Sequence, residues 1–173
     1  MTEEVKIAID AMGGENSPKK ILDGIDHFSK NKKDIFFNIF GDSNIIKSQI
    51  PKSISKSIYK IIHTDEFVKD EDSAFVGAKN KKTSMWRAVE SVKDLESDIV
   101  ISAGNTGALF VVAKLNLEMI NNIEKPALSG LWPNKKGMSV VLDLGANIEC
   151  NEKNLIDFSI MGSSLYKALY PDV

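Results

Sequence analysis

Three short segments of the chain combine glycine with small polar or acidic side chains, and each follows an apolar run. They span residues 10–14, 102–107 and 143–147. Glycine lets the backbone bend sharply and lets a ligand approach the backbone N–H groups closely. Where such a turn leads into a helix, the unpaired N–H groups and the helix dipole favour an anion. The chemistry that this pattern indicates is the binding of a phosphate-like group.

The middle segment has the clearest pattern, because a strand-like run precedes it and an apolar helical run follows it. One such turn more often caps a helix than binds a ligand. We expect all three segments at one edge of one sheet, where open α/β folds bind ligands, and this favours a phosphate site. The candidate substrate-binding residues in the three segments are Asp10, Gly13, Gly14, Ser102, Gly104, Thr106, Gly107 and Gly145.

Other residue types give weaker signals. Lys81, Lys82 and Arg87 can supply positive charge to an anion, although a solvated basic surface explains them equally well. Neither a P-loop nor a dinucleotide fingerprint follows any strand. The acidic run 65–72 fits a solvated loop better than a cation site, so we expect no metal. Two glutamates flank Cys150, and we expect a buried or inert cysteine rather than a nucleophile.

Composition limits the class of protein. Hydrophobic residues make up 43% of the 173 residues, enough for a globular domain with a sizeable core. The 22 basic and 24 acidic side chains give a net charge of −2, which argues against a nucleic-acid surface. The single cysteine excludes an internal disulfide, and neither a signal peptide nor a membrane-length apolar run is present. We therefore expect a cytoplasmic protein.

Strand and helix signals alternate along the chain. The patterns predict strands at 5–9, 35–40, 59–63, 99–102, 127–132 and 138–143. They predict helices from Pro18, over 44–50, after a cap at Thr83 or Ser84, over 107–120, and over 154–170. The connection 134–137 predicts a hairpin, so one strand runs antiparallel. The alternation is typical of an α/β fold with a mostly parallel sheet between helices.

Apolar spacing also predicts which helix faces are buried. The run over 107–120 is apolar nearly all round, so we expect that helix to be buried. On the helix from Pro18 the expected buried face is Ile21, Leu22, Ile25 and Phe28. On the helix after Thr83 it is Met85, Val89, Val92 and Leu95. On the helix over 154–170 it is Leu155, Phe158, Met161, Leu165 and Leu169.

Four groups of segments together resemble the PlsX family of bacterial acyl–acyl carrier protein:phosphate acyltransferases. The matching runs are 7–14, 84–85 with 102–108, 125–128 with 141–147, and 161–163. Their order and approximate spacing match along the whole chain, which is far more specific than one glycine turn. At Glu15 and Asn16 the chain departs from the family's Asp-His, so no role is carried over for that histidine.

The resemblance implies a Rossmann-like α/β/α sandwich, akin to isocitrate and isopropylmalate dehydrogenases and to phosphotransacetylases. It implies a homodimer that transfers a fatty acyl group from acyl carrier protein to inorganic phosphate, without an organic cofactor, in phospholipid and fatty acid synthesis. The family is about twice as long as this chain. We therefore expect residues 1–173 to be the N-terminal part of a single acyltransferase domain, truncated at the C-terminus and inactive alone, with any peripheral membrane association carried by the missing half.

In this chemistry phosphate itself is the nucleophile, so no activated serine or cysteine is needed. Holding it against a thioester carbonyl is worth up to about 7–11 kcal/mol, and the developing oxyanion must also be stabilised. Asn105 or Asn147 would donate to that oxyanion, and Lys82 or Arg87 would balance its charge. Three alternatives stay open: a dehydrogenase relative, which the absent fingerprint disfavours, a phosphotransacetylase using a coenzyme A thioester, and a truncated anion-binding domain without turnover.

Overall fold

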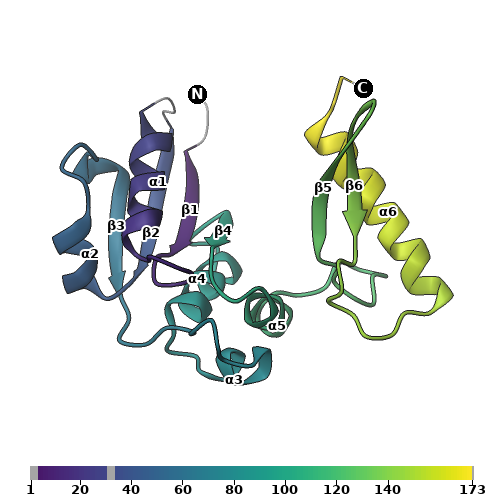
Figure 1. Cartoon of the computed structure of the whole chain (residues 1–173), viewed down its shortest axis with the longest axis horizontal. Coiled ribbons are helices and arrows are strands. Elements are labelled where there is room, and N and C mark those ends of the chain that lie inside the picture. The colour runs from purple at the N-terminus through teal and green to yellow at the C-terminus, as the bar shows by residue number, and fades with distance from the viewer. Residues whose placement is uncertain (1–3, 31–33, 173) are drawn as a thin grey trace. The chain divides into compact units, whose positions relative to one another are not determined.

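The computed structural model describes residues 4–30 and 34–172, and the chain divides into two compact units, Met1–Leu117 and Glu118–Val173. Each unit has its own β-sheet (Figure 1). The two units are described separately below.

The first unit is built on a parallel sheet of four strands. In sheet order these are β3 (Tyr59–His63), β2 (Ile35–Gly41), β1 (Val5–Asp10) and β4 (Ile99–Ser102), and every neighbouring pair is parallel. The α-helices of this unit are α1 (Lys19–Ser29), α2 (Ser43–Gln49), α3 (Ala74–Lys79), α4 (Ser84–Lys93) and α5 (Thr106–Asn116), with a 3-10 helix, η1 (Lys56–Ile58), before β3. This architecture confirms the predicted Rossmann-like α/β fold.

The order of the strands reverses beside β1. From β1 the chain adds β2 and β3 on one side, and it then crosses back to place β4 on the other side of β1. The last residues of these two strands, Asp10 and Ser102, are paired in register. Ligands of open α/β sheets bind beyond the carboxyl ends of the strands at such a reversal. The first two glycine segments therefore follow the two strands that border this position.

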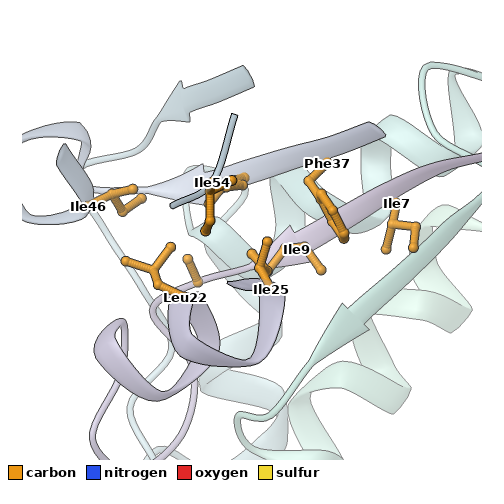
Figure 2. Close-up of a cluster of buried hydrophobic side chains, with 9 residues drawn as sticks. Ile7, Ile9, Leu22, Ile25, Phe37, Ile46 and Ile54 are labelled. Atoms are coloured by element: carbon orange, nitrogen blue, oxygen red, sulfur yellow. The ribbon is translucent and has the colours of Figure 1, made fainter. Parts of the chain in front are cut away.

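Helix α1 covers one face of the sheet. Its buried side chains Leu22 and Ile25 pack against Ile7, Ile9 and Phe37 of the strands (Figure 2). Side chains alternate along a strand, so the residues between these point to the other face. There α4 contributes Ala88 to a cluster with Ala8 and Phe40. Helices α4 and α5 meet in a further buried cluster that contains Met85, Val89 and Val112.

Two of the predicted helix stripes extend too far. Helix α4 begins after its cap, where Thr83 Oγ1 accepts a hydrogen bond from Trp86 N at 3.2 Å, but it ends at Lys93. Leu95 lies beyond that end with a φ of 60° and is 87% exposed, so the expectation that it is buried is wrong. Phe28, near the end of α1, is likewise 44% exposed. Leu95 is exposed because apolar spacing predicts a buried face only while the helix continues, whereas Phe28 is exposed although it still lies within α1.

The helix predicted over 107–120 is shorter and less buried than its composition suggests. Helix α5 ends at Asn116, and Ile120 lies outside it, 71% exposed. Within α5 the buried residues are Ala108, Val112 and Asn116, so the expectation that the helix is buried all round is wrong. The short helix α3, which the sequence pattern does not predict, packs against α5.

The second unit consists of an antiparallel hairpin and one long helix. Strands β5 (Ser129–Asn134) and β6 (Gly137–Leu142) pair antiparallel, which confirms the predicted hairpin, and α6 (Glu152–Leu169) packs against β6. On α6, Phe158 is buried as predicted, whereas Leu155 and Leu169 are exposed. In the described ranges no helix is long and apolar enough to cross a membrane.

The contrast between Leu22 and Phe28 on α1 is testable. Leu22 is fully buried, so Leu22→Ala should lower the free energy of unfolding by about 2–5 kcal/mol. Phe28→Ala, on the same predicted stripe but half exposed, should lower it by only about 1 kcal/mol. Urea unfolding of the two variants of the chain measures both values. Equal losses would mean that the stripe is buried along its whole length.

Candidate functional site

A buried carboxylate joins the carboxyl ends of β1 and β4. Asp10, the last residue of β1, is only 1% exposed. Its Oδ1 accepts a hydrogen bond from Ser84 Oγ at 2.6 Å, and its Oδ2 accepts one from Ser102 Oγ at 2.7 Å. Ser84 is the first residue of α4, and Ser102 is the last residue of β4. One side chain therefore connects three elements whose residues lie 74 and 92 positions apart in sequence.

Neutral hydrogen-bond donors, rather than basic side chains, contact this carboxylate. Burial raises the pKa of Asp10 above its ordinary value, because the charged form loses water. The hydrogen bonds from Ser84 and Ser102, and then those from the backbone of Met12 and Gly13, act in the opposite direction. None of the ion pairs formed by the described residues includes Asp10. The start of α4 adds the favourable end of a helix dipole.

The two glycine segments of the first unit touch each other through their backbones. A Cβ placed on Gly13 would lie 2.6 Å from Asp10 Oδ2 and 2.9 Å from Gly104 Cα. A Cβ on Gly14, whose φ is 88°, would lie 2.3 Å from Ala103 O. These positions therefore have no room for a side chain. Glycine serves here to bring two loops into contact as well as to turn the chain.

The first turn of α5 offers unpaired backbone donors. Asn105 caps this helix, and its Oδ1 accepts a hydrogen bond from Ala108 N at 2.9 Å. The first N–H groups of a helix have no partner inside it. The cap satisfies Ala108, and no described residue accepts from the N–H groups of Thr106 and Gly107. Such a turn can bind an anion.

The side chains of Ser102 and Asn105 already have partners. Ser102 Oγ donates to Asp10, and it accepts a hydrogen bond from Gly104 N at 3.2 Å. Asn105 Nδ2 donates to the carbonyl oxygens of Asp70 at 3.2 Å and Asp72 at 2.9 Å, which ties the loop before α3 to the start of α5. To donate to a substrate oxygen, Asn105 would have to release one of these carbonyls.

The basic candidates lie on the surface. Lys82 and Arg87 are both exposed, and Arg87 Nε lies 3.2 Å from Glu90 Oε2 on the same helix. Lys81 Nζ lies 5.4 Å from the centre of the Trp86 ring, a cation–π distance. Of these three residues, Lys82 is nearest in sequence to Ser84.

The third glycine segment belongs to the second unit. It follows β6, which pairs with β5 in a separate sheet, so the expectation that all three segments border one sheet is wrong. The hairpin connection turns β6 back along β5 instead of adding it to the parallel sheet. Asn147 Nδ2 donates to Pro126 O at 2.9 Å and to Asp143 Oδ1 at 3.0 Å, and Gly145 takes a φ of 83°. These contacts hold the turn together and attach it to the segment before β5.

Cys150 also lies in the second unit, and it is exposed rather than buried. Partial loss of water raises the pKa of its thiol, and so do the hydrogen bond to Asp143, at 3.4 Å from Sγ to Oδ2, and the charge of that carboxylate. The raised pKa disfavours the reactive thiolate. After the loss of water, the groups that raise the pKa belong to Asp143, and the neighbouring glutamates of the sequence argument do not contribute.

Ser84 is the site residue that spacing did not single out. The sequence marked it as a helix-cap candidate and as part of the resemblance, whereas the structure places its hydroxyl, fully buried, on Asp10. A buried serine at the first position of a helix has no periodic pattern that would identify its distant partner. The signal that could have pointed to Ser84 is that residues 10 and 84 both lie in the segments that resemble the acyltransferase family.

Steric crowding at Gly14 gives a direct test of the loop contact. Gly14→Ala should lower the free energy of unfolding by about 1–3 kcal/mol or more, because the residue has a positive φ and faces Ala103 O. Gly24→Ala on α1 is the matched control: nothing lies within 4 Å of the new Cβ, and alanine should stabilise the helix by about 0.5–1 kcal/mol. Chemical denaturation of both variants provides the comparison, and a neutral Gly14→Ala would show that the loops are not in contact.

Comparison with known proteins identifies the family. The family model described as fatty acid synthesis protein matches residues 5–173. A phosphate acyltransferase of Pelagibacter ubique (strain HTCC1062) is 65% identical over 173 residues, which cover 99% of this chain and 52% of the relative. A phosphate acyltransferase of Xanthobacter autotrophicus (strain ATCC BAA-1158 / Py2) is 40% identical over 174 residues, covering 98% of this chain and 49% of the relative.

The chain thus spans about half the length of the curated relatives that it matches. The match extends over both units and includes the glycine segments at 10–14, 102–107 and 143–147. These findings confirm the resemblance seen in the sequence: the chain belongs to the fatty acid synthesis protein family, whose members here are named phosphate acyltransferases.

Proposed function

We propose that this chain forms part of an enzyme that transfers a fatty acyl group from acyl carrier protein to inorganic phosphate. The observation that carries the proposal is the meeting of two glycine turns at the strand reversal beside β1, where the first turn of α5 presents the free N–H groups of Thr106 and Gly107. The name of the relatives supports the same reaction. A phosphate held at this turn would occupy the position where α/β sheets bind ligands.

The proposed reaction needs no nucleophile from the protein. A phosphate oxygen attacks the thioester carbonyl carbon, a tetrahedral intermediate forms, and its collapse breaks the C–S bond. The products are acyl phosphate and the carrier thiol, which takes up a proton. The task of the protein is to hold phosphate in attack geometry and to stabilise the oxyanion. Backbone N–H groups suit the first task because they attract an anion without reacting with it.

Two polar side chains of the first unit are proposed to assist. Asn105 would exchange one of its backbone carbonyl partners for the oxyanion when substrate binds. Lys82, exposed and two residues before the buried Ser84, would balance the added negative charge. Arg87 is the weaker candidate of the two cations, because its charge is partly offset by Glu90.

The proposed setting is phospholipid synthesis in the bacterial cytoplasm, with acyl carrier protein as the donor partner. The same proposal includes three further points. The enzyme is a homodimer, it contacts the membrane peripherally, and residues 1–173 are part of a single acyltransferase domain. These points come from the resemblance of the matching segments to the acyltransferase family, to which the chain belongs.

The reaction is testable with a polypeptide of the relatives' length that carries this chain. Incubated with acyl carrier protein thioester and inorganic phosphate, it should form acyl phosphate, which hydroxylamine traps as a hydroxamate. Gly104→Val should lower this rate at least about tenfold, because a Cβ at Gly104 would lie 3.0 Å from Gly13 Cα and would push the two turns apart. Gly24→Ala, with open space around its Cβ, should keep the rate of the unchanged protein.

The outcomes separate the candidate functions. Faster conversion of a coenzyme A thioester than of the carrier thioester would favour a phosphotransacetylase. Phosphate binding without conversion of either thioester would favour an anion-binding domain. A folded Gly104→Val variant with the full rate would contradict the placement of phosphate at this turn.

A further inference from the structure

The Asp10 carboxylate is enclosed by groups of the protein itself, although the glycine segment that contains it suggested contact with substrate. It is 1% exposed, and its two oxygens are occupied by Ser84 and Ser102. We propose that Asp10, Ser84 and Ser102 are positioning residues. They fix the backbone that leads into the first turn of α5, where phosphate is proposed to bind, and Asp10 itself does not touch the substrate. This inference rests on the proposed function and adds to it the residues that shape its site.

The direction of each hydrogen bond follows from the chemistry of the groups. An ionised carboxylate only accepts hydrogen bonds, so both serine hydroxyls must donate to Asp10. Each serine oxygen is then left with lone pairs. Ser102 Oγ uses one of them to accept the hydrogen bond from Gly104 N at 3.2 Å. A continuous chain of donors therefore runs from Gly104 N–H through the Ser102 hydroxyl to Asp10, and charge-assisted bonds of this kind are the stronger ones.

This chain of hydrogen bonds sets the orientation of one peptide group. The N–H of Gly104 and the carbonyl of Ala103 belong to the same planar unit. When Ser102 holds the N–H on the Asp10 side, the carbonyl is fixed as well, and Ala103 O lies against Gly14. The residues that follow, Asn105 and Thr106, then enter α5 from a fixed direction. Asp10 therefore holds the Ala103–Gly104 peptide through Ser102, and this peptide sets the direction of the Thr106 and Gly107 N–H groups that would bind phosphate.

In the same arrangement, the start of α4 contacts a carboxylate of the protein itself, Asp10. Helix α4 begins at Ser84, whose hydroxyl contacts Asp10, and the carboxylate occupies the anion-favouring side of that helix start. At α5 the N–H groups of Thr106 and Gly107 have no acceptor among the described residues. An ionised Asp10 repels an incoming phosphate, whereas the α5 donors attract it. The resident carboxylate therefore helps to direct phosphate to α5.

A purely structural role is the competing explanation, and α4 provides a matched control for it. Ser91 is a second buried serine of the same helix, 4% exposed, whose hydroxyl donates to Ala88 O at 2.8 Å and whose Oγ lies 3.1 Å from Ser97 Oγ. Ser91→Ala removes a buried hydroxyl and its hydrogen bonds without touching the Asp10 network. Its effect measures what the loss of any buried serine of α4 does to stability and activity.

The test compares Ser84→Ala, Ser102→Ala, Ser102→Thr and Ser91→Ala in the polypeptide of the relatives' length. Binding of inorganic phosphate is measured by calorimetry, and the rate of acyl phosphate formation is measured with each substrate varied in turn. Ser84→Ala and Ser102→Ala should weaken phosphate binding and lower kcat by about 10- to 100-fold, while KM for acyl carrier protein stays within about twofold. Ser102→Thr keeps the hydroxyl and should restore both quantities. Ser91→Ala should change neither.

The failure of this inference is distinguishable from the failure of the proposed function. If the unchanged protein binds phosphate and forms acyl phosphate, but Ser84→Ala and Ser102→Ala behave like Ser91→Ala, the positioning role is overturned and the function stands. If the unchanged protein binds phosphate without turnover, the binding series alone decides on the positioning role. If it binds no phosphate, the site itself and the inference built on it both fail.

Discussion

The hydrogen bonds between the Asp10 carboxylate and the hydroxyls of Ser84 and Ser102 are the interaction on which the candidate site depends. They join the end of β1, the start of α4 and the end of β4 around a carboxylate that is only 1% exposed. Burying a charge without such partners would be costly. Removal of either serine leaves the other end of a hydrogen bond unsatisfied in the interior, which costs more than the bond contributes when formed.

The sheet and the glycines make this arrangement possible. Parallel pairing of β1 with β4 brings Asp10 and Ser102 into register, at the strand reversal where open α/β sheets bind ligands. Gly13 and Gly14 let the loop after β1 lie directly on the loop after β4. With side chains at these positions, the turn that leads into α5 would be displaced from the carboxylate that orients it. The fold, the loop contact and the proposed anion site therefore depend on the same contacts.

The local parts of this structure could be predicted from the sequence, whereas the long-range parts could not. Alternation and turn residues located β1 to β4, and Thr83 was recognisable as a helix cap. The pairing of Asp10 with Ser84 could not be predicted, because no periodic signal links residues 74 positions apart. The exposure of Leu95 depends on where α4 ends, and its spacing continues past that point.

For the candidate site, too, local features could be predicted from the sequence and long-range contacts could not. The glycine segments at 10–14 and 102–107 each follow a strand of the parallel sheet, as the sequence predicted. The same composition at 143–147 follows a hairpin strand, and it was wrongly assigned to that sheet because glycine content carries no information on strand pairing. The sequence also named Ser102 and Asn105 as donors to a ligand, and it gave no sign that both side chains already donate to protein groups.

The central claim is that phosphate binds at the first turn of α5, and amide NMR of the isotope-labelled polypeptide of the relatives' length tests it most directly. On titration with inorganic phosphate, the backbone N–H signals of Thr106 and Gly107 should shift with one saturable binding curve. Their unpaired N–H groups become hydrogen-bonded to the anion. Saturable shifts at other positions, with Thr106 and Gly107 unchanged, would contradict the account.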